Sequence, residues 1–175
     1  MLGVLAALAG HAQAQSQLQA QAVPQAQAQV QAPMGRATAD ELVEKLAPPS
    51  APLTRSMRNL VPQRRQVDLV VNFDFDSARL QDASRPLLES LAQALNSERL
   101  KGTRFKVEGH TDGKGSARYN DELSSRRAQA VAAFLVSQGV ESGRLETTGR
   151  GFSELLVPDR PDAAENRRVR VIAVE

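Results

Sequence analysis

The chain of 175 residues contains no cysteine and no tryptophan, and its aromatic side chains are one tyrosine and five phenylalanines. Without cysteine there is no disulfide, no thiolate metal ligand and no thiol nucleophile. The few aromatic rings provide no stacking platform for single-stranded nucleic acid. No stretch approaches the twenty or so apolar residues that a membrane-spanning helix needs. These absences exclude several classes of enzyme and nucleic-acid-binding protein.

Excess charge of one sign is also missing, since the formal net charge is +2. Residues 1–65 carry six basic and three acidic side chains, whereas residues 66–175 carry sixteen and seventeen. A nucleic-acid-binding domain normally shows a basic excess, so no nucleic-acid partner is predicted. The composition changes at residue 66 as well, which indicates one folded domain preceded by an N-terminal segment.

The N-terminal segment contains few large apolar side chains. Residues 1–9 form a short apolar run, and His11-Ala12-Gln13-Ala14 follows it, which predicts a signal peptide at residues 1–14. Residues 15–65, rich in Ala, Gln and Pro, are expected to be a flexible spacer. Within the spacer, Thr38 and Glu41 match a capping box and predict a short helix at residues 39–47. Its small apolar face leaves two alternatives open, docking on another surface or fraying.

From residue 66 onward, regular apolar patterns predict a complete domain at residues 66–175. Alternation predicts strands at 67–73, 104–109, near 145–149 and at 169–173. Helical periodicity predicts two main helices, one from about 84 to 97 and one from 119 or 120 to 139. The order β-α-β-α-β-β predicts an α+β fold of two layers. In it, a mixed four-stranded sheet carries both helices on one face.

The second of these helices carries a charge where a core residue is expected. Leu123, Arg127, Val131 and Leu135 recur every four residues and therefore share one face. A buried guanidinium needs a partner, and Asp112 follows the strand at 104–109. Spacing alone favours a structural Asp112–Arg127 ion pair, or an arginine that reaches solvent along its stem. The alternative is a polar pocket with one group of each charge, suited to a zwitterion.

The motifs of residues 66–175 resemble those of OmpA-like C-terminal domains. The matching residues are Phe73-Asp74-Phe75-Asp76-Ser77-Ala78 with Leu80, Gly109-His110-Thr111-Asp112 with Gly115, Tyr119-Asn120 with Leu123-Ser124, Arg127-Ala128, Gly149 with Gly151, and Asn166-Arg167-Arg168-Val169. The resemblance implies a periplasmic module that holds peptidoglycan noncovalently through the diaminopimelate residue of the stem peptide. It makes the pocket, rather than the structural ion pair, the favoured interpretation.

The resemblance also implies the role of each site residue. Asp112 would receive the ammonium group of diaminopimelate and Arg127 its carboxylate, which suits the two parallel donors of a guanidinium. Less certain ligand contacts are implied for five further residues, Asp74, Thr111, Asn120, Leu123 and Arg167. For Asn120 and Leu123, helix capping and core packing are alternatives of equal weight.

The expected function is peptidoglycan binding that tethers or scaffolds an envelope component, in the periplasm and in association with the outer membrane. No catalytic residue, metal site or cofactor is predicted, because His110 lacks further ligands at a recognisable spacing and no Ser-His-Asp arrangement is evident. The alternatives are an envelope protein-interaction domain without wall binding and an enzyme acting on peptidoglycan. The spacer and its short helix are the candidate contacts to an envelope protein partner.

Overall fold

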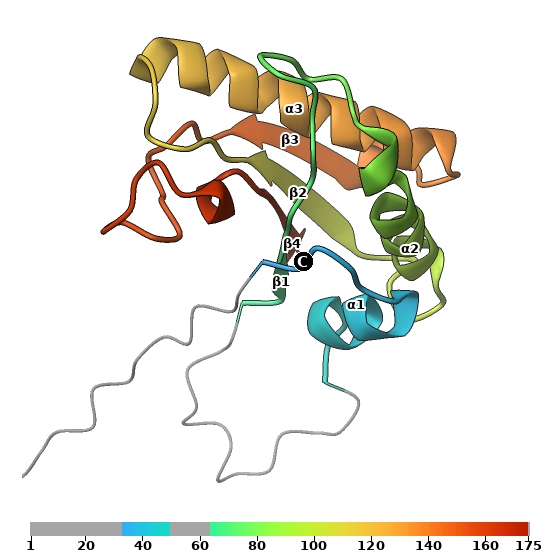
Figure 1. The fold of residues 1–175 in the computed structure, drawn as a ribbon. Helices are drawn as coiled ribbons and strands as arrows, with labels where there is room; N and C mark the ends of the chain where they lie inside the picture. Colours follow the sequence, from blue (N-terminus) through green and yellow to red (C-terminus); the bar gives the residue numbers. More distant parts are fainter. Residues whose placement is uncertain (1–32, 50–63, 175) are drawn as a thin grey trace, which may run out of the picture.

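A computed structural model of the protein describes residues 33–49 and 64–174. The predicted signal peptide and most of the predicted spacer lie outside these residues. The elements in chain order are α1 (Ala39–Leu46), β1 (Gln66–Leu69), η2 (Asp82–Ser84), α2 (Arg85–Asn96), β2 (Arg104–Gly109), α3 (Ala117–Ser137), η3 (Ser142–Arg144), β3 (Leu145–Gly149), η4 (Ala164–Asn166) and β4 (Val169–Val174), where η marks a short 3-10 helix (Figure 1).

The four strands form one mixed sheet in the order β1-β4-β2-β3. β4 is antiparallel to β1 and to β2, whereas β2 and β3 are parallel. Alternate residues such as Phe105, Val107 and Val171 are fully buried on one face of the sheet. The helices pack on that face, with α3 lying along β2 and β3 (Figure 1). The predicted α+β fold, with its mixed sheet and strand-helix order, is confirmed.

Two predicted boundaries are wrong. β1 ends at Leu69 instead of residue 73, because the chain leaves the sheet there and Asn72 donates its backbone N–H to the Ser84 hydroxyl, 2.7 Å away. Only an isolated bridge between Phe73 and Leu80 follows. α3 begins at Ala117, two residues before its predicted start, because the Ser116 side chain caps it.

The short helix α1 is part of the domain core. Its capping box is formed as predicted, with Thr38 as the N-cap and Glu41 bonding back to the Thr38 backbone. Leu42 and Leu46 are fully buried in the same hydrophobic cluster as α2. The helix therefore docks instead of fraying. Its apolar face is occupied within the chain and is therefore not available to an envelope partner.

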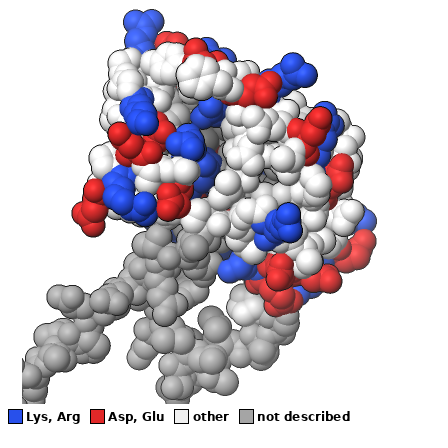
Figure 2. Space-filling model, viewed as in Figure 1, with Lys and Arg blue, Asp and Glu red and all other residues white. Residues whose placement is uncertain are grey.

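The other face of the sheet is charged and internally paired. Asp68 accepts hydrogen bonds from Arg168 at 3.0 Å and from Arg170 at 2.9 Å, and Glu108 accepts two from Arg150 at 2.7 and 3.0 Å. Acidic and basic groups are also interspersed over the surface visible in Figure 2. The charges of this face therefore neutralise one another locally.

Candidate ligand-binding site

The candidate site lies at the end of the sheet where β1, β2 and β3 finish and β4 begins. In the antiparallel pair of β2 and β4, Gly109 is opposite Val169, and in that of β1 and β4, Leu69 is opposite Val169. The segment 110–112 therefore continues past the sheet beside residues 166–168. This register brings Asp112 and Arg167 together, although 55 residues separate them in sequence.

Two glycines allow α3 to lie directly against the ends of β2 and β3. A Cβ atom at Gly109 would be 2.2 Å from the Ser124 backbone oxygen, and one at Gly149 would be 2.6 Å from the Asp121 oxygen. Real Cβ atoms do not approach backbone this closely, so only glycine fits at either position. The close contact sets the N-terminal half of α3, including Leu123, against the ends of β2 and β3.

Arg127 is half-buried on α3 and has mainly uncharged contacts. Its Nε–H donates to the Ser77 carbonyl at 3.0 Å, and its guanidinium carbon lies 4.9 Å from the centroid of the Phe73 ring. Burial lowers the pKa of Arg127 and the positive charge of Arg167 lowers it further, while Asp112 raises it. Both Asp112 and Arg127 lie in the described part of the chain, and no direct ion pair joins them. The structural Asp112–Arg127 ion pair, one of the two sequence interpretations, is wrong.

Asp112 is paired with Arg167 instead. The Nη1 atom of Arg167 lies 2.9 Å from Oδ2 of Asp112, and the Lys114 backbone N–H donates to Oδ1 at 3.3 Å. The Asp112 side chain is 14% exposed and that of Arg167 is 47% exposed. The carboxylate is therefore largely enclosed, while its arginine partner remains open to solvent.

A cavity of about 220 Å³ lies beside these charges. Arg127 and Arg167 are its two charged lining residues, and the remaining lining residues are Val70, Val71, Asn72, Phe73, Gln81 and Ala164. The cavity therefore presents two guanidinium groups and no carboxylate. Such a lining suits a planar anion, because a guanidinium can donate two parallel hydrogen bonds to a carboxylate.

Three other predicted site residues, Asp74, Thr111 and Leu123, do not line the cavity. Asp74 is not part of the cavity lining, and its carboxylate lies 3.6 Å from Arg79. Thr111 is buried with its hydroxyl unpaired among the described residues. Leu123 is buried but is not part of the main hydrophobic cluster.

Asn120 fastens the loop that leads into α3. Its side-chain amide donates to the Lys114 carbonyl at 2.6 Å and to the Ser116 carbonyl at 3.1 Å. The helix cap itself is Ser116. Asn120 therefore shapes the loop next to Asp112, a role close to the capping alternative.

Sequence reasoning missed the residues that support Arg127. Phe73 belongs to the recognised motif but received no role, and the Ser77 carbonyl has no side-chain signal at all. Asn72 and Gln81, which also line the cavity, had no signal either. Only the position of Arg127 on an apolar helix face indicated that something must cover it.

His110 is buried two residues before Asp112. Both of its ring nitrogens lack hydrogen-bond partners among the described residues. Burial, with the charges of Arg168, Arg170 and Arg150, lowers the pKa of His110 to about 3, so the ring is neutral at pH 7. No group of three side chains suited to a metal ion occurs in residues 33–49 or 64–174.

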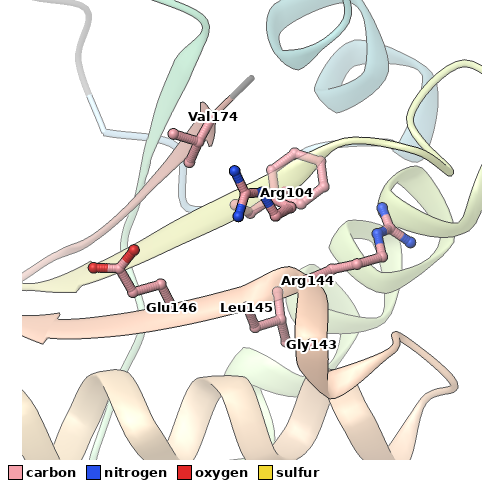
Figure 3. A pocket seen from close by; sticks show the side chains of 7 residues that line it. Arg104, Gly143, Arg144, Leu145, Glu146 and Val174 are labelled. Carbon is pink, nitrogen blue, oxygen red and sulfur yellow. The ribbon is translucent and has the colours of Figure 1, made fainter.

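A second cavity, of about 280 Å³, lies at the opposite end of β2 (Figure 3). Arg144 lines it and extends toward α2, where its Nη2 donates to the Leu95 and Leu100 carbonyls, each at 2.8 Å. Its Nε donates to the Thr103 carbonyl at 3.0 Å. Arg144 thus satisfies backbone acceptors at and beyond the end of α2, a purpose that needs no ligand.

A family model described as the OmpA family matches residues 72–169, which include the candidate site. The chain belongs to the OmpA family. It is 42% identical over 108 residues to outer membrane porin F of Pseudomonas aeruginosa, covering 59% of this chain and 30% of the porin. It is 37% identical over 101 residues to the peptidoglycan-associated lipoprotein of the same species, covering 57% of this chain and 58% of the lipoprotein.

Solved structures of OmpA-family domains share the fold. The cell wall anchor of the type VI secretion system (T6SS) of P. aeruginosa matches with a TM-score of 0.51 and 31% identity, covering 62% of this chain and 79% of that one. The similarity spans less than two thirds of the porin and of the lipoprotein. The names of these relatives agree with the predicted location in the periplasm and at the outer membrane. No described helix is long and apolar enough to cross a bilayer.

Proposed function

We propose that this OmpA-family domain binds peptidoglycan noncovalently through the diaminopimelate residue of the stem peptide. The observation that carries the proposal is the cavity with two guanidiniums beside an enclosed carboxylate. The free end of diaminopimelate carries one carboxylate and one ammonium group. Arg127 would hold the carboxylate through its fork, and Asp112 would accept from the ammonium.

The Asp112–Arg167 pair has little value as a support of the fold. Arg167 is nearly half exposed, and ion pairs of this kind contribute about 0–1 kcal/mol to stability. Arg127 has a buried stem and no direct carboxylate partner among the described residues. A structural role explains neither arrangement, whereas a zwitterionic ligand would satisfy Arg127 and Asp112 together.

A binding function without catalysis is the form we propose. The Ser124 hydroxyl donates to the Asp121 carbonyl and accepts from the Gly151 N–H, so it is engaged in holding the backbone. His110 contacts no serine hydroxyl by hydrogen bond within the described residues. With no candidate nucleophile activated, the site can hold a ligand but has no evident means to cleave one.

Wall binding would tie this chain to peptidoglycan and thereby scaffold an envelope component. The peptidoglycan-associated lipoprotein and the cell wall anchor are related proteins whose names describe such attachment. A partner contact through the N-terminal segment belongs to this proposal. The parts of the spacer at residues 15–32 and 50–63 would provide that contact, since the apolar face of α1 is already buried.

A sedimentation assay with purified diaminopimelate-type sacculi tests the proposal. Arg127→Lys keeps the charge but removes the fork, and Asp112→Asn keeps the shape but removes the charge. Each should weaken binding about 10- to 100-fold, the value of a charge-assisted hydrogen bond. Arg126→Ala is the matched control, because Arg126 is the exposed neighbour of Arg127. Wild-type protein that stays in the supernatant would reject the proposal.

A further inference from the structure

Arg167 connects the two halves of the candidate site. Its Nη1 atom is paired with Asp112 at 2.9 Å, and its side chain also lines the cavity that contains Arg127. Its backbone is fixed between η4 and β4, because it caps η4 and its N–H donates to the Ala164 carbonyl at 3.0 Å. The side chain is 47% exposed and can therefore turn without disturbing the core.

The charges of the ligand-free site are unequal. Arg127 and Arg167 line the cavity, no carboxylate belongs to its lining, and Asp112 beside it is already paired with Arg167. The charge of Arg167 lowers the pKa of Arg127 more than either Asp112 or Asp76 raises it. The lining of the cavity is therefore positive, and the Asp112 carboxylate beside it is occupied.

We propose that Arg167 determines specificity by occupying Asp112 until a ligand supplies an ammonium and a carboxylate together. This inference rests on the proposed function. The ligand ammonium takes the place of Arg167 on Asp112, and the released guanidinium joins Arg127 on the ligand carboxylate. Binding is then an exchange of ion pairs in which Asp112, Arg127 and Arg167 each face a group of opposite charge on the ligand.

A ligand with only one of the two groups cannot complete this exchange. An amine alone would have to displace Arg167 from Asp112, leaving two guanidiniums beside one cavity without an anion. Like charges brought together in a partly desolvated site oppose such binding. A carboxylate alone could bind Arg127 but would leave the Asp112–Arg167 pair unchanged. Arg167 therefore adds a repulsive element against stem peptides that carry lysine in place of diaminopimelate.

Two stem tripeptides with amidated C-termini provide the test, one with diaminopimelate at its third position and the other with lysine, so that only the diaminopimelate residue carries both an ammonium and a carboxylate. Binding of each to the full chain is measured by titration calorimetry for wild type and Arg167→Ala. The variant should bind the diaminopimelate peptide about 10-fold more weakly, because one charged donor is lost. It should bind the lysine peptide about two- to fivefold more tightly, because Asp112 is now free.

Two controls separate this role from a general loss of structure. Arg160→Ala removes the same charge from an exposed position before β4 and should leave both affinities unchanged. The double variant Asp112→Asn/Arg167→Ala should lose the gain for the lysine peptide, since that gain requires the free carboxylate. Unchanged melting temperatures would confirm that the variants are folded.

The outcomes distinguish the two proposals. If wild type binds neither tripeptide, both the proposed function and the role of Arg167 are rejected. If wild type prefers the diaminopimelate peptide and Arg167→Ala binds the lysine peptide no better than wild type, only the exchange is rejected. A gain for the lysine peptide that persists without the Asp112 carboxylate would also overturn it.

Discussion

Replacing Leu46 with alanine tests whether α1 belongs to the folded domain. Leu46 is fully buried within the cluster that contains the α2 leucines. Leucine-to-alanine changes in cores cost about 2–5 kcal/mol, through lost transfer free energy and the cavity left behind. Because α1 lies at the margin of the core and can partly close the gap, we expect about 3 kcal/mol. Alanine has the higher helix propensity, so the loss can only come from packing.

Urea unfolding of the full chain measures this change. With a slope of about 1.5–3 kcal/mol/M, the midpoint should fall by roughly 1–2 M and the slope should stay constant. Glu44→Ala is the matched control in the same helix. Glu44 is exposed and forms an ion pair with Arg99, so its replacement should cost less than about 1 kcal/mol.

Equal midpoints for Leu46→Ala and Glu44→Ala would refute the docking of α1. A frayed helix would leave both residues in solvent, and neither substitution would then alter unfolding. Such a result would return the start of the folded domain to residue 66. A clear difference between the two variants would instead place residues 33–47 within it.

Two further predictions concern the end of β2. Because the folded pKa of His110, about 3, lies below its unfolded value, stability should fall as pH drops from 6.5 toward 3. This contribution is on the order of 2–3 kcal/mol between pH 7 and 4.5, and His110→Leu should remove it from pH-dependent urea midpoints; parallel profiles would contradict this. Gly109→Ala should lower stability by about 1–3 kcal/mol in the same assay, because the added Cβ would meet the Ser124 carbonyl. Gly143→Ala is the control and should have little effect, since the space around Gly143 is open. Similar losses for both variants would show that α3 does not contact β2 so closely.

Local patterns were sufficient to predict most of the fold. Phe105 and Val107 alternate with charged neighbours, and this periodicity identified β2 and its buried face. The capping box at Thr38 predicted α1 to within one residue of its end. Docking of α1 could not be predicted, because it depends on the surface of α2, and no periodicity within α1 describes that surface. The early end of β1 likewise depends on the hydroxyl of Ser84, which accepts from the backbone N–H of Asn72, twelve residues earlier in the chain.

Of the predicted site residues, Arg127 and Arg167 line the cavity, and Asp112 pairs with Arg167. The helix stripe correctly marked Arg127 as a charge with an apolar surrounding, and spacing made Asp112 its natural partner. Strand register decided otherwise, since β4 delivers Arg167 to Asp112. The resemblance implied a ligand contact for Arg167 and none for its neighbour Arg168. Arg168 turns to the opposite face of the sheet, where it is buried against Asp68.

The pairing explains why Arg127 has no direct ion pair among the described residues. Asp112 continues β2, and Arg167 precedes β4 in the adjacent antiparallel strand, so the sheet itself keeps these two side chains in contact. Arg127 comes from the other layer and finds a carbonyl and an aromatic ring instead of a carboxylate. The free-energy cost of desolvating Arg127 is therefore only partly offset in the free protein, and a bound carboxylate would offset the remainder. A fold that paired Asp112 with Arg127 would satisfy both residues and leave neither of these two groups for a ligand.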